Sequence, residues 1–122
     1  MIAAHRRAAD PAAERDALVW RALSDPTRRA LLDRLRAGPA TAGTLASGFA
    51  MSRFGVRKHV AQLVEAGLVL VEERGRERWH RLNPAPIRAI YKRWIRPFEE
   101  GASDHVLEIQ ERAERRARKA RR

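Results

Sequence analysis

The sequence predicts a mainly helical fold with one small β-hairpin, and three patterns support this class. An aspartate followed by a proline occurs at residues 10–11 and again at 25–26, and this pair is typical of a helix start. Apolar residues recur every three or four positions after each pair and again after Ser52, which is the period of a helix with one buried face. An alternating run at 68–72, the turn sequence RGRE and a second run at 78–82 predict a hairpin. At 122 residues the chain is long enough for one domain with a modest core.

The first part of the chain predicts three helices in succession. One covers about residues 11–24 and the next about 26–37, where a glycine–proline pair ends it. Thr41 is placed to cap a short third helix, in which Leu45 and Phe49 share one side. Two glycines weaken this third helix, so tertiary packing must stabilise it.

A fourth helix is predicted between Ser52, a good N-cap, and Gly67, which suits the position just past a helix end. One apolar stripe runs along it: Val56, Val60, Leu63 and Val64. Beside the stripe lies a strip that we expect to face outward: Arg53, Phe54, Arg57, Lys58 and Ala61. Such a helix is about 20 Å long, and a DNA major groove can admit it.

Behind the hairpin, the sequence NPAP precedes a helical C-terminal region. Large apolar residues repeat there every three to four positions: Ile87, Ile90, Trp94 and Phe98, followed by Val106 and Ile109. Pro97 is expected to kink or divide this helix, because proline lacks the backbone N–H. The last residues, 112–122, carry seven positive charges and one negative charge. We therefore predict a domain over 1–111 and a basic tail over 112–122 that frays and attracts DNA nonspecifically.

Two helices joined by residues 50–52, with a hairpin directly behind the second, predict a winged helix-turn-helix. The N-terminal end of the second helix presents free backbone amides and a positive dipole to phosphates. Side chains of its first turns then reach base edges: Arg57 and Lys58 match guanine O6 and N7. At the tip of the hairpin, Arg74 and Arg76 are expected to lie on phosphates or in a narrow minor groove.

The sequence leaves several side-chain roles open. Phe54 either contacts a thymine methyl or packs against Met51 or the hairpin. For His59 a hydrogen-bonded packing role is the first interpretation, and a phosphate contact is the alternative. The tryptophans are interpreted as anchors of the core or of a dimer interface.

The net charge of +11 points to a polyanionic partner, and double-stranded DNA is the partner we predict. The chain has no cysteine, which excludes disulfides and thiolate metal sites. Its start lacks the apolar segment of a signal peptide, and no apolar run is long enough to span a bilayer. A cytoplasmic location without membrane contact is the expectation.

Three motifs together resemble the ArsR family of winged-helix repressors: ALSDPTRR at 22–29, SRFGVRKHV at 52–60 and EAGLV at 65–69, followed by a Gly-Arg wing. The resemblance extends from Val19 to Pro84. It implies a homodimer, paired through the first and last helices, that binds a pseudo-palindromic operator and represses transcription. The predicted DNA-binding residues are Ser52, Arg53, Phe54, Arg57, Lys58, His59, Gln62, Arg74 and Arg76. The predicted dimer interface consists of Leu18, Ile90, Trp94, Phe98, Val106 and Ile109.

The sequence departs from the metal-sensing members of that family. Leu45-Ala46-Ser47 stands where their cysteines lie, and the last helix offers one histidine, His105, with Asp104 and Glu108. This cluster is interpreted as a solvated part of the interface, because one histidine per subunit falls short of such a metal site. We expect no metal and no cofactor, and the sequence identifies no effector ligand.

Other classes of function account for the sequence less well. An enzyme is not expected, because the four histidines are scattered over different elements and no nucleophile elbow is present. A basic nucleoid- or RNA-associated protein explains the charge equally well, but not the helix cap, stripe and wing in register. A winged helix that contacts protein is a third hypothesis, for which binding would depend little on salt.

Overall fold

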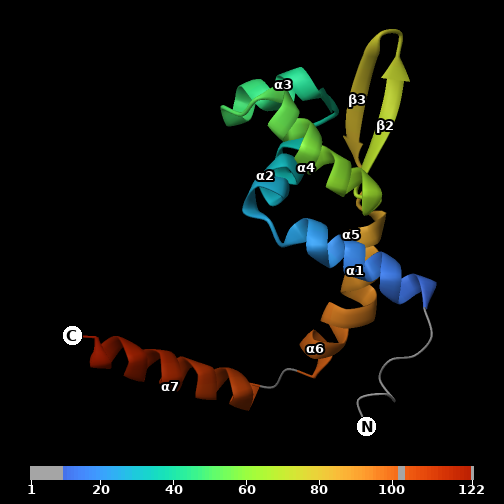
Figure 1. Cartoon of the computed structure of the whole chain (residues 1–122). Coiled ribbons are helices and arrows are strands. Elements are labelled where there is room, and N and C mark those ends of the chain that lie inside the picture. Colours follow the sequence, from blue (N-terminus) through green and yellow to red (C-terminus); the bar gives the residue numbers. More distant parts are fainter. Residues whose placement is uncertain (1–9, 102–103, 122) are drawn as a thin grey trace. The chain divides into compact units, whose positions relative to one another are not determined.

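The computed structural model describes residues 10–101 and 104–121 of the chain (Figure 1). These residues fall into two compact units, one ending at Arg88 and the other beginning at Ala89, and each is described by itself. None of the described helices has the length and apolarity needed to cross a membrane.

The first unit contains the predicted helices in the predicted order: α1 (Pro11–Leu23), α2 (Pro26–Leu35), α3 (Ala42–Phe49) and α4 (Arg53–Glu65). In each, a capping side chain accepts a hydrogen bond from a backbone N–H two or three residues further on: Asp10, Asp25, Thr41 and Ser52. These caps satisfy backbone donors that have no partner inside the helix. All four helix predictions are confirmed, with ends that differ by one or two residues.

The turn between α3 and α4 makes the helix-turn-helix. Ala50 ends α3 with φ of +50°, in the left-handed region that favours glycine, and its N–H still donates to the Ala46 carbonyl oxygen. Two residues later Ser52 caps α4, so only three residues join the two helices. The turn is therefore tight enough to fix the direction of α4 relative to α3.

The hairpin is confirmed, but the sheet has one strand more than the sequence predicted. Strands β2 (Val69–Arg74) and β3 (Glu77–Leu82) pair antiparallel and are joined by a tight turn in which Gly75 has φ of +61°. The short strand β1 (Ala40–Thr41) pairs with the other edge of β3, giving the order β1-β3-β2. A strand of two residues has no visible alternation, which is why the pattern did not reveal it. In Figure 1 the tip of the hairpin projects past the helices of this unit.

The core of this unit fixes the rotation of α4. Val56, Val60 and Leu63 on α4 are buried together with Leu31 of α2 and Leu45 of α3. Burial of each such side chain stabilises the fold by about 1.5–3 kcal/mol. The predicted stripe is thus confirmed except at Val64, which is 38% exposed. The strip beside the stripe is exposed along its whole length, as predicted.

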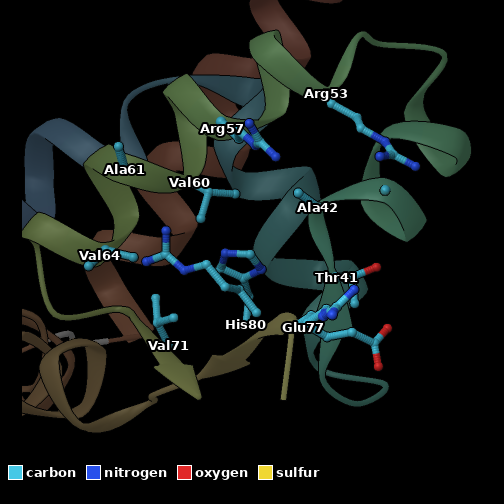
Figure 2. A pocket seen from close by; sticks show the side chains of 13 residues that line it. Thr41, Ala42, Arg53, Arg57, Val60, Ala61, Val64, Val71, Glu77 and His80 are labelled. Carbon is cyan, nitrogen blue, oxygen red and sulfur yellow. The ribbon is translucent and has the colours of Figure 1, made fainter. Parts of the chain in front are cut away.

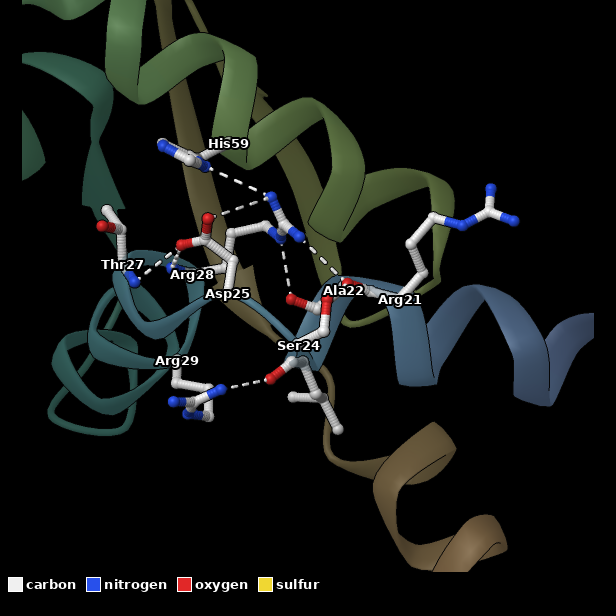
Figure 3. Close-up of polar contacts among 9 residues, drawn as sticks. Arg21, Ala22, Ser24, Asp25, Thr27, Arg28, Arg29 and His59 are labelled. Carbon is white, nitrogen blue, oxygen red and sulfur yellow. Dashed lines mark hydrogen bonds and ion pairs between the residues drawn. The ribbon is translucent and has the colours of Figure 1, made fainter.

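Arg28 connects α1, α2 and α4 through one buried guanidinium (Figure 3). Its Nε donates to the Ala22 carbonyl oxygen at 2.7 Å, and its Nη2 donates to that of Arg21 at 2.9 Å, at the end of α1. Nη1 lies 3.8 Å from Asp25 Oδ2 and 3.4 Å from His59 Nδ1 on α4. Asp25 also caps α2, and the hydrogen bond from the Arg28 backbone N–H is the main cause that holds the pKa of Asp25 below its usual value.

The second unit contains the C-terminal helices. The chain enters it from α5 (Ala85–Ile90) and continues as a π-helical turn, η2 (Tyr91–Ile95), and α6 (Arg96–Glu100). The Arg96 N–H donates to the Tyr91 carbonyl oxygen, five residues back. The irregular turn lies directly before Pro97, so the predicted break at this proline is confirmed in the form of a π turn.

The basic tail is helical, and the expectation that it frays is wrong. Helix α7 (Asp104–Ala120) crosses the predicted boundary between residues 111 and 112 without a break. Gln110 donates to Glu114 and Arg115 pairs with Glu111, and such contacts one turn apart support an exposed helix. Acidic Asp104 in the first turn and basic Arg118 and Lys119 in the last turn also suit the helix dipole.

We predict that Arg28→Met lowers the free energy of unfolding by about 2–4 kcal/mol, because it leaves the Ala22 and Arg21 carbonyl oxygens without their charged donor. The matched control is Arg29→Met: Arg29 also donates to a carbonyl oxygen at the end of α1, that of Leu23 at 2.7 Å, but it is exposed. The control should change stability by no more than about 0.5 kcal/mol. Denaturant unfolding measures both, and equal losses would contradict the role given to Arg28.

Candidate nucleic-acid interface

The outer face of α4 presents cations at the helix N-terminus. The Ser52 hydroxyl accepts a hydrogen bond from the Gly55 N–H at 3.0 Å and so closes the first turn. Arg53, Arg57 and Lys58 are all exposed, and Gln62 is exposed one turn beyond Lys58. The positive end of the helix dipole adds to these charges. The structure therefore gathers the predicted residues of α4 on an accessible and strongly cationic surface.

Phe54 lies on this surface rather than in the interior. It is 69% exposed, and the Lys58 ammonium lies 5.0 Å from the centre of its ring. This cation–π contact holds both side chains beside each other on the outer face. The alternative that Phe54 packs against Met51 or the hairpin is therefore not what the structure shows.

His59 takes the packing role that was the first interpretation. Its ring is half-buried, and Nδ1 lies 3.4 Å from the Arg28 guanidinium. Because a guanidinium only donates, Nδ1 is the acceptor in this contact. His59 thus connects α4 to the Arg28 cluster.

The two arginines near the hairpin tip differ in their surroundings. Arg74 lies 3.1 Å from Glu72 Oε2 and 4.9 Å over the Trp79 ring. The hydrogen bond from Arg74, followed by that from Arg81, lowers the pKa of Glu72 and keeps this carboxylate ionised. Arg76 is exposed and has no ion pair or hydrogen bond within the described residues. Arg76 is therefore the freer of the two cations at the tip.

A groove of about 680 Å³ separates α4 from the hairpin (Figure 2). Apolar side chains of α4 and β2 form one part of it, namely Val60, Ala61, Val64 and Val71. Its charged lining consists of Arg53, Arg57, Arg76, Arg78 and Glu77, so four cations face one anion. Thr41, Ala42, Gly43 and His80 complete it.

Arg53 reaches across the end of this groove toward α3 (Figure 2). A Cβ atom added to Gly43 would lie 3.0 Å from Arg53 Nη2, so a side chain at position 43 would shift the exposed guanidinium by a few tenths of an ångström. Gly43, one of the two glycines that weaken α3 as a helix, thus leaves room for the Arg53 side chain beside it.

Sequence reasoning missed four polar residues of the groove: Thr41, Glu77, Arg78 and His80. Thr41 was assigned only as a helix cap, and the pairing of β1 with β3 places it beside the groove. In β3 the side chains alternate, so His80 and Arg78 share a face. That period was readable in the sequence, but which face meets α4 was not.

The residues predicted for a dimer interface differ in exposure. Trp94, Phe98, Val106 and Ile109 are exposed, and the rings of Trp94 and Phe98 lie 4.8 Å apart. Leu18 is half-buried. Ile90 is only 2% exposed, so it has little surface left for a second subunit.

Comparisons with known proteins agree with this geometry. A family model described as a helix-turn-helix domain matches residues 23–72. The HTH-type transcriptional regulator Rv2034 of Mycobacterium tuberculosis is 39% identical over 71 residues, which cover 58% of this chain and 66% of that protein. The transcriptional repressor SdpR of Bacillus subtilis is 37% identical over 65 residues, which cover 53% of this chain and 72% of that protein.

Solved structures give the same result. The crystal structure of an ArsR family transcriptional regulator is 35% identical to this chain, with a TM-score of 0.64. The match covers 77% of this chain and 94% of that protein. An ArsR-like transcriptional regulator from Rhodococcus sp. RHA1 is 29% identical, with a TM-score of 0.68, and the match covers 85% of this chain and 96% of that protein. Fold and surface together define a winged helix-turn-helix transcriptional regulator. The chain belongs to the ArsR family, as the motifs at 22–29, 52–60 and 65–69 predicted.

Proposed function

We propose that the protein is a homodimeric repressor that binds a pseudo-palindromic DNA operator through α4 of each subunit. The observation that carries this proposal is the outward face of α4, where Arg53, Arg57 and Lys58 are exposed while the neighbouring residues Val56, Val60 and Leu63 are buried. Relatives named as a transcriptional regulator and a transcriptional repressor support it. Acting on DNA, the protein would work in the cytoplasm, without catalysis.

Contacts to bases and to phosphates divide between two elements. With α4 in the major groove, Arg57 and Lys58 are placed to read guanine O6 and N7, and the exposed ring of Phe54 is placed to meet a thymine methyl. The N-terminal end of α4, with its free backbone amides and its cap Ser52, then faces a phosphate. Arg76 at the hairpin tip takes the neighbouring backbone or a narrow minor groove.

The exposed apolar residues of the second unit support a second copy of the chain as partner. Trp94, Phe98, Val106 and Ile109 are large apolar side chains that are each more than half exposed, and exposed apolar patches are typical of protein–protein interaction sites. Large aromatic side chains are typical anchors of such interfaces. Two subunits related by two-fold symmetry would place their α4 helices about one DNA turn apart, which is why the operator is expected to be pseudo-palindromic.

Selection of bound fragments from genomic DNA tests this function. A regulator should enrich short sites with two-fold symmetry near promoters, and duplex DNA should compete for binding better than structured RNA. Random enrichment with equal competition by RNA would indicate the basic nucleoid- or RNA-associated protein instead.

We predict that Arg57→Glu weakens binding to a selected site by about thirtyfold or more, since removal of one base contact costs about 1–3 kcal/mol and a dimer has two such contacts. Stability should hardly change, because Arg57 is exposed. The matched control is Arg36→Glu, an exposed arginine at the end of α2 that pairs with Asp33. Gel retardation gives the affinities, and normal binding by the Arg57 variant would overturn the assignment of α4.

At the hairpin tip, Arg76→Ala should weaken binding to all sequences alike and lower the salt slope by about one unit for each phosphate that the arginine no longer neutralises. Arg74→Ala is the matched control and should have the smaller effect, because Glu72 already compensates Arg74. Affinities measured over a series of salt concentrations separate the two. A changed base preference at unchanged affinity would contradict a phosphate role for Arg76.

Trp94→Glu should produce monomers, because a carboxylate on the exposed apolar surface opposes its burial between subunits. Lys92→Glu, on the same exposed segment, is the control and should remain dimeric. Analytical ultracentrifugation measures the assembly state. We choose Trp94 over Ile90 because Ile90 is buried, so a charge there would disturb folding first. A dimer that survives Trp94→Glu would move the interface to α1.

A further inference from the structure

His80 is the one histidine of the described residues that lines the groove between α4 and the hairpin. Its side chain lies among groove residues of α4, β1 and β3 (Figure 2). The residue is 8% exposed, and Nδ1 lies 3.2 Å from the Ala40 carbonyl oxygen. Since a carbonyl oxygen only accepts, Nδ1 carries a proton. This contact fixes the ring, and it leaves Nε2 as the atom whose protonation changes the charge.

Nε2 is available to a ligand. It has no hydrogen bond with any of the described residues. It is also not fully buried, because Trp79 Nε1 is the one fully buried side-chain nitrogen or oxygen without a partner among these residues. In the neutral ring Nε2 is an acceptor, whereas the groove around it is lined by donors: Arg53 and Arg57 of α4, and Arg76 and Arg78 of the hairpin. Glu77 is the one acidic residue of the lining, and Thr41 on β1 adds an uncharged hydroxyl.

A neutral imidazole among arginines suits a protein that awaits an anion. In the free protein, burial lowers the pKa of His80, and the charge of Arg78 lowers it further, while the hydrogen bond to Ala40 opposes them. The ring therefore stays uncharged at neutral pH. An anion brought into the groove would reverse this balance, because an opposite charge nearby favours the imidazolium.

We propose that this groove holds a phosphoryl group, and that His80 takes up a proton when the group binds and donates Nε2–H to it. The proposal rests on the proposed function, since the source we favour is the backbone of the DNA that lies between α4 and the hairpin. A free phosphate is the other source of the same chemistry. The groove thus becomes a phosphate contact coupled to one proton in each subunit.

The coupling has a definite sign. Phosphoryl binding raises the pKa of His80, so the complex binds more protons than the free protein between the two pKa values. Affinity must then rise as pH falls through that window. One proton per subunit allows at most about a tenfold change in affinity per pH unit for each subunit. Below the pKa of the free protein the effect disappears, because both states are protonated.

Nuclear magnetic resonance of labelled histidine rings tests this directly. We would titrate the wild-type protein from about pH 8 to about pH 5 alone, with a mixed-sequence DNA duplex and with millimolar inorganic phosphate. The expected result is an Nδ1–H tautomer in the free protein and a higher pKa of His80 with the duplex. A rise with the duplex alone assigns the site to DNA. A rise with inorganic phosphate as well assigns it to phosphoryl groups in general. No rise with either overturns the proposal.

Binding measurements add a second readout. Affinity for the duplex should increase more steeply on acidification for the wild-type protein than for His80→Gln. His105→Gln, an exposed histidine of α7, is the matched control and should keep the wild-type slope. Equal slopes for all three proteins would overturn the proton coupling and leave the proposed function standing. Failure of the wild-type protein to bind any duplex would overturn both.

Discussion

A single buried guanidinium connects the helices that hold α4 in place. Arg28 is 7% exposed and satisfies the carbonyl oxygens at the end of α1, approaches the cap of α2, and meets His59 on α4. A buried charge is costly unless it is paired and fully hydrogen-bonded, and here the partners come from three helices at once. Any shift of one helix would leave the charge with fewer partners. The apolar stripe of α4 sets its rotation, and the Arg28 cluster adds a polar constraint on its position.

The functional surface follows from this constraint. Because one side of α4 is buried, Arg53, Arg57 and Lys58 face outward together, and the hairpin adds Arg76 and Arg78 across the groove. Internal compensation is uneven: Glu72 compensates Arg74, whereas Arg76 has no counter-ion within the described residues. The uncompensated cations lie around the groove and along α4. Such an arrangement favours a long anion with regularly spaced charges.

Local signals in the sequence predicted most of the fold. Caps such as Ser52 and the turn glycine Gly75 act within a few residues, so helix starts and the hairpin could be read directly. Strand β1 is too short for any pattern, and the burial of Arg28 depends on carbonyl oxygens that only the folded chain brings together. The cationic face of α4 was predictable because it follows from the period of one helix. The place of His80 in the groove was not, because it depends on the pairing of β1 with β3.

The central claim is that the outward face of α4 lies in a major groove in each half of a symmetric site. Methylation interference at guanine N7 on a selected site tests it most directly, because N7 is exposed only in that groove. We expect two clusters of interfering guanines whose centres lie about one helical turn apart. Interference confined to adenine N3 in the minor groove, or none at any guanine of a site that contains them, would contradict it.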